Sequence, residues 1–366
     1  MTKKFNLENL VAEVFGPRPG DVFAILADRP ETASGDNPAW QERRDMAADW
    51  RDQIAAMGER HGFNALPLVS FPAVADANAE FPAYASVAGE KKPFTEVLDQ
   101  ATVVISMTEV SITGPLMAFA NTKGSAEKFR VASMPLANRS MEDTCLMADT
   151  RFLVKRGNVI LDAMKDAQAA EVRFTTGDTC MFDLRFRQAY VDNGYLHPDK
   201  EGDAFINLPS GEVWIVPYEG ERPGEKSRTR GIIPVAGGHN EIARFVVEEN
   251  RITDVMGEGA HADALREELD IDPARRNVGE IAFGYNYAAR VTGLFIEDEK
   301  AGFHWGYGRS EFLGGTVGPE AFRTPDTVLH RDLPYAKECP VTVSVDLVKT
   351  GGERLPVLRD GDYVLR

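Results

Sequence analysis

The chain has 366 residues, which is more than one typical domain core holds, so two domains are expected. Its formal net charge is −16, and this acidity argues against binding to a nucleic-acid backbone, which requires clustered Lys and Arg. Hydrophobic residues make up 43% of the chain, but no stretch approaches the roughly 18 consecutive apolar residues of a membrane span. We therefore expect small-molecule or peptide partners rather than nucleic acids or membranes.

The N-terminal segment, residues 1–15, contains two lysines but neither a long apolar core nor a small-residue cleavage site. The three cysteines, Cys145, Cys180 and Cys339, are far apart and form no CxxC pair. Unpaired thiols of this kind are typical of a reducing compartment. These features predict a cytoplasmic protein.

Short apolar runs alternate with helical stretches in the first part of the chain. Buried strands are predicted at residues 21–27, 65–71, 101–107 and 129–134. A long helix is predicted to begin at Asn37-Pro38, an N-cap followed by a first helical position, and to end at Gly62. Strands separated by helices predict an α/β domain with a doubly wound, mostly parallel sheet over residues 1–165. No nucleotide-binding glycine motif follows the first strand, so this domain is interpreted as a scaffold.

The pattern changes after residue 165 to short β-rich segments interrupted by Gly, Pro and Asn. The run at residues 341–348, VTVSVDLV, alternates like a half-buried antiparallel strand. A helical segment near residues 260–269 is the exception. We therefore predict that residues 166–366 form an α+β domain with a curved antiparallel sheet.

His330 and Asp332 are separated by one residue within an apolar stretch that should form a strand. Residues two apart on a strand point to the same face, so the imidazole and the carboxylate are expected to lie together. Such a pair is a common beginning of a divalent-metal site. A surface histidine beside an acid is the alternative interpretation.

Three more potential ligands lie where an apolar strand meets a glycine-rich turn. Glu212 follows a Pro-Ser-Gly turn, Glu280 precedes a buried-looking run, and His304 is flanked by glycines. A charge in such a position is either solvated at a strand end or paired within a site.

Four segments that contain these residues, LPSGEV, VGEIAF, GFHWGYGRS and HRD, resemble motifs of the aminopeptidase T family of metallopeptidases in order and approximate spacing. The similarity covers roughly residues 170–340. It implies an α/β domain, a second domain with a two-metal site, and a homodimer. Carried over by position, the implied metal ligands are Glu212, Glu280, His304, His330 and Asp332. Glu311 stands where the family usually has a tyrosine and is either a further ligand or a solvated acid.

The resemblance implies a metallo-hydrolase that holds two divalent ions (Zn, Co or Mn) and cleaves an amide bond of a small substrate or peptide. Glu212 and Glu280 are its implied catalytic residues, one of them bridging the ions. Arg290 and Arg309 either hold a substrate carboxylate or form surface pairs, and His239 lies in a pocket or a simple loop.

The second half also resembles the ring-cleaving 2,5-dihydroxypyridine dioxygenases, which hold one Fe(II) with two His and one Asp. The HRDLPY segment carries this likeness. Those enzymes, however, have a histidine at the position of Glu280 and lack the acid of LPSGEV. The two acids therefore favour the hydrolase. A purely structural metal site is a third interpretation, but none of the cysteines lies in a suitable motif.

Overall fold

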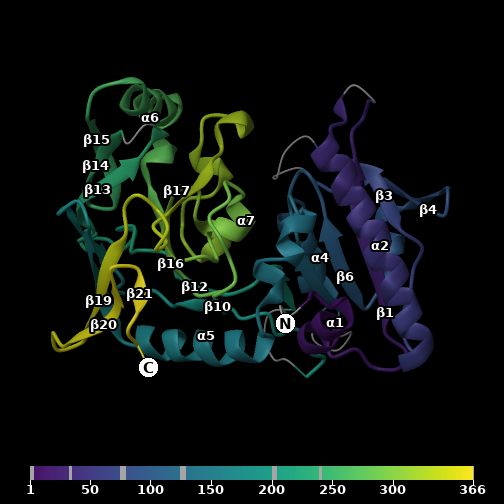
Figure 1. The fold of residues 1–366 in the computed structure, drawn as a ribbon. Helices are drawn as coiled ribbons and strands as arrows, with labels where there is room; N and C mark the ends of the chain where they lie inside the picture. Colours follow the sequence, from purple (N-terminus) through teal and green to yellow (C-terminus); the bar gives the residue numbers. More distant parts are fainter. Residues whose placement is uncertain are drawn as a thin grey trace. The chain divides into compact units, whose positions relative to one another are not determined.

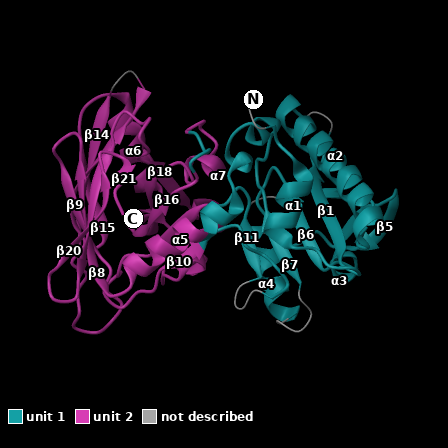
Figure 2. Cartoon of the chain, turned by 60° about the horizontal axis from the view of Figure 1, so that its bottom comes forward, with its two compact units in different colours: residues 1–154, 192–210, 287–290 teal, residues 155–191, 211–286, 291–366 magenta. Residues whose placement is uncertain are grey.

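The computed structural model describes residues 4–32, 35–74, 80–123, 129–199, 204–238 and 241–365. The chain forms two compact units, each built from segments that are distant in sequence (Figure 2). Unit 1 consists of Met1–Val154, Asp192–Ser210 and Tyr287–Arg290, and unit 2 consists of Lys155–Val191, Gly211–Asn286 and Val291–Arg366. The predicted boundary at residue 165 refers to two independently folding domains. These compact units do not test it, so it stays a prediction.

Unit 1 is built on a mostly parallel sheet with strand order β11-β7-β6-β1-β3-β4-β5, and β2 pairs with β1 beside this path. Strands β1, β2, β3, β6, β7 and β11 are joined by parallel pairings, whereas β4 and β5 are antiparallel additions at one edge. The strands are β1 (Val22–Arg29), β2 (Asn64–Ala65), β3 (Val69–Pro72), β4 (Tyr84–Val87), β5 (Glu90–Pro93), β6 (Val103–Met107), β7 (Arg130–Ser133) and β11 (Phe205–Asn207). The predicted doubly wound α/β architecture is confirmed.

Helices α1 (Leu7–Phe15), α2 (Pro38–His61), α3 (Phe94–Asp99) and α4 (Thr113–Lys123) accompany this sheet (Figure 1). As predicted, α2 begins after Asn37, whose side chain accepts a hydrogen bond from the Trp40 amide, and ends at Gly62. Its apolar stripe, which includes Met46, Trp50 and Ile54, is fully buried. Capping and amphipathic spacing together explain why this helix could be located from the sequence.

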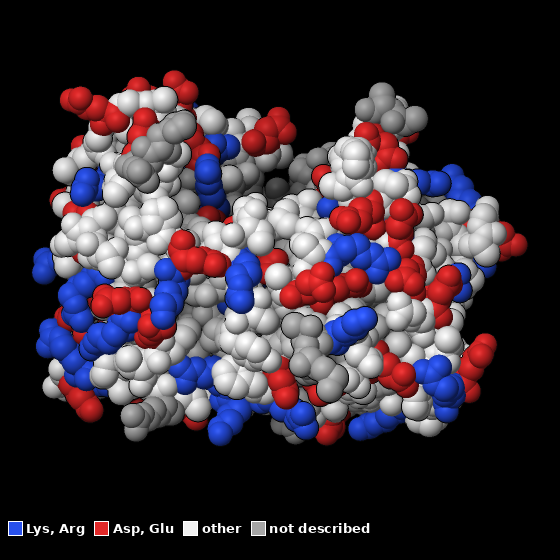
Figure 3. All heavy atoms as spheres, in the orientation of Figure 1, with Lys and Arg blue, Asp and Glu red and all other residues white. Residues whose placement is uncertain are grey.

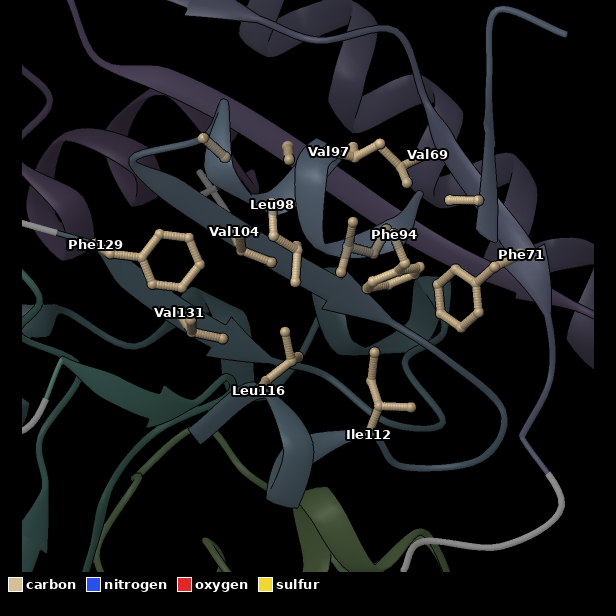
Figure 4. Close-up of a cluster of buried hydrophobic side chains, with 14 of the residues drawn as sticks. Val69, Phe71, Phe94, Val97, Leu98, Val104, Ile112, Leu116, Phe129 and Val131 are labelled. Carbon is tan, nitrogen blue, oxygen red and sulfur yellow. The ribbon is translucent and has the colours of Figure 1, made fainter. Parts of the chain in front are cut away.

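The core of unit 1 is a cluster of aliphatic and aromatic side chains between the sheet and its helices (Figure 4). Phe94 packs edge-on against Phe71, with ring centroids 5.0 Å apart. Val104 on β6 and Val131 on β7 contribute from the neighbouring parallel strands. The interior of unit 1 is therefore apolar, and its role as a scaffold stays a prediction.

Unit 2 contains two sheets. The larger has the order β15-β14-β13-β9-β8-β19-β20-β21 and is antiparallel throughout. Its strands are β8 (Ala167–Phe174), β9 (Thr179–Asp183), β13 (Arg230–Ala236), β14 (Ile242–Glu248), β15 (Arg251–Met256), β19 (Val343–Lys349), β20 (Arg354–Arg359) and β21 (Asp362–Tyr363). This antiparallel architecture confirms the predicted α+β class.

The smaller sheet has the order β10-β12-β16-β17-β18. Its strands are β10 (Tyr190–Asp192), β12 (Glu212–Ile215), β16 (Val278–Gly284), β17 (Phe303–Gly308) and β18 (His330–Pro334). The helices are α5 (Thr150–Met164), within which the chain passes from unit 1 to unit 2, α6 (Ala260–Ile271) and the short α7 (Phe295–Asp298). All the predicted ligands from Glu212 to Asp332, apart from Glu311, lie on strands of this sheet.

Among the described residues, no helix is long and apolar enough to cross a membrane. Acidic and basic side chains are interspersed on the face shown in Figure 3. The expectation that nucleic acids are not partners stays a prediction.

Candidate metal centre

The register of the smaller sheet places the predicted ligands on one face. Glu280 on β16 is paired with Gly306 on β17, and Gly306 is paired with Asp332 on β18. His304 lies two residues before Gly306, and His330 lies two residues before Asp332. Residues paired across strands, and residues two apart along a strand, project from the same side of a sheet.

Glu212 joins this face through the neighbouring strand. It is the first residue of β12 and is paired with Gly284 at the end of β16, four residues after Glu280. Every residue of β16 is buried, because its apolar sequence is covered on both faces. The strand therefore carries Glu280 into the interior, where a carboxylate requires compensating charge.

The side chains form two overlapping groups of potential ligands, in each of which the ligand atoms lie within 4.8 Å of one another. The inner group consists of Glu212, Glu280 and His304, all buried. The outer group consists of Glu280, His330 and Asp332. The side chains of His330 and Asp332 are 15% and 13% exposed, so the outer group is the one closer to solvent.

Glu280 belongs to both groups because its two carboxylate oxygens face different imidazoles. Oε1 lies 3.9 Å from Nε2 of His304, and Oε2 lies 3.1 Å from Nε2 of His330. Nε2 of His304 is also 3.7 Å from Oε2 of Glu212, and Nε2 of His330 is 3.2 Å from Oδ1 of Asp332. This is the arrangement of a carboxylate that can bridge two cations.

Backbone carbonyl groups orient both imidazoles. Nδ1 of His330 is 2.6 Å from the carbonyl oxygen of Arg309, and Nδ1 of His304 is 3.5 Å from that of Gly302. A carbonyl oxygen only accepts, so each Nδ1 donates and each Nε2 is directed toward the carboxylates. Metal-bound histidines are commonly oriented in this way.

The ionisation of these groups reflects their crowding. Burial by itself lowers the pKa of His330, but the carboxylates of Asp332 and Glu280 raise that pKa well above its ordinary value. Burial by itself raises the pKa of Asp332, but the adjacent His330 lowers it to about 2. The carboxylate of Asp332 therefore stays ionised and attracts positive charge.

Two observations test whether this set suits a metal ion. Oδ1 of Asp332 is buried and makes no well-aligned hydrogen bond among the described residues, although Nε2 of His330 lies 3.2 Å away. A Cβ added to Gly306, between the paired Glu280 and Asp332, would lie 2.6 Å from that same oxygen and 3.1 Å from Nε2 of His330. The glycine thus leaves space beside an acceptor that lacks a well-aligned donor. With three carboxylates and two imidazoles, the residues fit a divalent cation.

The structure does not bring Glu311 into either group. Glu311 lies in the short 3-10 helix η7 (Glu311–Leu313), and both of its oxygens accept hydrogen bonds from the guanidinium of Arg309, at 2.7 and 2.8 Å from Nε. Arg309 is accordingly engaged in a local ion pair. Arg290 donates to the carbonyl groups of Tyr287 and Ala289. His239 lies outside the described residues.

Sequence reasoning missed Glu299 and Lys300, which lie shortly before β17 in the chain. Lys300 is completely buried, and its ammonium contacts a carboxylate oxygen of Glu212 and, at 2.7 Å, Oε1 of Glu299. Burial raises the pKa of Glu299 to about 8, although Lys300 opposes this shift. Residues 297–300 read Glu-Asp-Glu-Lys, a run that resembles a solvated turn, yet all four are buried. The closeness of residues 297–300 to His304 in the sequence was the only feature that could have pointed to Glu299 and Lys300.

No family model matches the chain, and a search of curated proteins gives no match. Among solved structures, a 2,5-dihydroxypyridine dioxygenase from Pseudomonas putida is similar with a TM-score of 0.65 and 17% identity, covering 98% of this chain and 96% of the other. AmpT from Thermus thermophilus is similar with a TM-score of 0.58 and 16% identity, covering 98% of both chains. At these identities the likeness establishes the fold. Both resemblances noted in the sequence are thereby confirmed at the level of the fold, which this chain shares over nearly its whole length with two enzymes.

Proposed function

We propose that the protein is a metal-dependent hydrolase of the aminopeptidase T type, which cleaves an amide bond of a small substrate or a peptide N-terminus. The observation that carries this proposal is the carboxylate of Glu280, whose two oxygens face His304 and His330 in two different ligand groups. Hydrolysis of amides is a reaction for which paired metal sites are suited. The similarity to AmpT supports the same reaction class.

Each group would hold one divalent ion, and Glu280 would bridge them. Bound divalent ions supply an activated water at neutral pH and polarise the carbonyl group of the substrate. The chain holds the site in shape through the carbonyl groups that orient His304 and His330. We assign the proton taken from water to Glu212 or Glu280, whose oxygens lie 3.7 and 3.9 Å from Nε2 of His304. Substrate would enter beside His330 and Asp332, which are the most exposed of the ligands.

The Fe(II)-dependent ring-cleaving dioxygenase is the second candidate. The dioxygenase gives the higher of the two TM-scores, and His304, His330 and Asp332 have the composition of a triad of two His and one carboxylate. Against it, the two imidazoles belong to different groups, and the carboxylate of Glu280 stands between them. The hydrolase is therefore the better supported candidate.

Metal content and activity distinguish the two. Protein dialysed against chelator should lose activity on amino-acid anilides and regain it with Zn²⁺, Co²⁺ or Mn²⁺, binding close to two ions per chain. Glu280→Gln should not regain it, whereas Glu353→Gln, an exposed acid, should behave like the unaltered protein. One iron per chain, with oxygen uptake on 2,5-dihydroxypyridine, would instead establish ring cleavage. A failure to hydrolyse any anilide with any of these metals would count against the proposal.

The family resemblance also leads us to propose that the enzyme acts as a cytoplasmic homodimer. Light scattering after size exclusion should then give twice the chain mass of 40.3 kDa.

A further inference from the structure

Lys300 brings a fixed positive charge into the candidate metal centre. The side chain is completely buried, and its ammonium lies between the carboxylates of Glu212 and Glu299. Lysine is almost never buried to this degree unless it is paired, because its charge must be removed from water. These two contacts therefore fix where the ammonium sits.

The position of this ammonium makes the two ligand groups different. Glu212 belongs to the inner group, and its Oε1 is engaged by Lys300, so Oε2 is the oxygen that faces His304. In the outer group, by contrast, the carboxylates of Glu280 and Asp332 form ion pairs only with imidazoles among the described residues. The ammonium thus contacts a ligand of the inner group directly, whereas it acts on Asp332 of the outer group only through its electrostatic field.

We infer that the two groups bind divalent ions with unequal affinity: the outer group fills first and tightly, and Lys300 keeps the inner group weak and exchangeable. Two effects act in the same direction. A hydrogen bond from the ammonium withdraws electron density from the carboxylate of Glu212, and the ammonium repels a second cation across a short distance in a buried site. This inference rests on the proposed two-metal hydrolase and specifies the order in which its site is filled.

Glu299 has a separate part in this arrangement. Its Oε1 accepts from the ammonium at 2.7 Å, so it shares Lys300 with Glu212. Replacing the carboxyl group of Glu299 by an amide would leave Lys300 in place, with Glu212 as its remaining carboxylate partner in these contacts. Removing the ammonium would take away its contact with Oε1 of Glu212. The two substitutions are therefore a matched pair, of which only the loss of the ammonium should tighten the inner group.

Calorimetric titration of chelator-treated protein with Mn²⁺ tests the inference without relying on activity. The unaltered protein should show two classes of site whose dissociation constants differ by at least about 10-fold. In Lys300→Met, the weaker class should tighten by at least about 10-fold, while the tighter class changes by less than about 3-fold. In Glu299→Gln, the weaker class should stay weak or weaken further.

If Lys300→Met alone fails to fold, judged by near-ultraviolet circular dichroism, the double variant Lys300→Met/Glu299→Gln should be tested. It removes the ammonium together with the carboxyl group that accepts its second contact, and it should show the same tightening. One ion bound to the unaltered protein and two to the Lys300 variant would also support the inference. Equal classes in the unaltered protein, or an unchanged weak class without the ammonium, would overturn it and leave the hydrolase standing. No Mn²⁺ binding by any of these proteins would overturn the metal centre itself.

Discussion

Each unit of the molecule encloses an aspartate carboxylate, but the two carboxylates have different surroundings. In unit 1, Asp28 on β1 accepts hydrogen bonds from the indole of Trp40 and from the backbone amides of Glu109 and Val110. In unit 2, Asp332 on β18 faces the imidazole of His330, and its Oδ1 makes no well-aligned hydrogen bond among the described residues.

The difference separates a structural carboxylate from one that is available to a ligand. Neutral donors from α2 and from the loop after β6 satisfy Asp28, and burial still raises its pKa above the ordinary value. Asp332 is instead placed among other acceptors, so the positive charge beside it determines its ionisation. A carboxylate among other carboxylates and imidazoles favours the binding of a cation, whereas a carboxylate that accepts hydrogen bonds from N–H groups does not.

The largest effect should come from Asp332→Asn. This change removes a charged ligand from the outer group, and alterations around metal ligands alone cost about 10- to 100-fold in affinity or activity. Loss of a ligand itself should lower anilide hydrolysis by at least about 1000-fold and leave the protein with less than its full metal content. The measurements are turnover and elemental analysis after gel filtration; full metal loading of the variant would contradict the assignment.

Asp28→Asn should instead lower the stability of the protein and leave its metal content unchanged. The new amide nitrogen cannot accept a hydrogen bond, so either the indole of Trp40, bound to Oδ1, or the amide of Val110, bound to Oδ2, loses its partner. The free energy of unfolding should fall by about 2 kcal/mol, as measured by urea denaturation. Metal content should not change. A loss of metal with unaltered stability would mean that the two carboxylates do not differ in the way described above.

The smallest effect should come from Glu311→Gln. The carboxylate of Glu311 is bound by Arg309 and lies outside both ligand groups, and partly exposed ion pairs contribute only about 0–1 kcal/mol. Metal affinity should stay within about 2-fold of the unaltered protein in a competition titration. A decrease beyond about 10-fold would place Glu311 among the ligands after all.

Local patterns in the sequence determined much of the fold. The cap at Asn37 and the apolar stripe behind it located α2, because a helix has its own hydrogen-bonding and burial period. The spacing of His330 and Asp332 placed both on one face of a strand for the equally local reason that strands repeat every two residues. The resemblance of four short segments added the remaining three members of the two ligand groups.

Only the tertiary structure decided which of these residues meet. Strand β11, far along the chain, completes the sheet of unit 1, and the pairing of β12, β16, β17 and β18 brings Glu212 and Asp332 onto one sheet although 120 positions separate them in the sequence. The same packing buries Lys300 beside Glu212 and leaves Glu311 with Arg309. Strand order and the burial of a charge depend on contacts between distant segments, which no local period encodes.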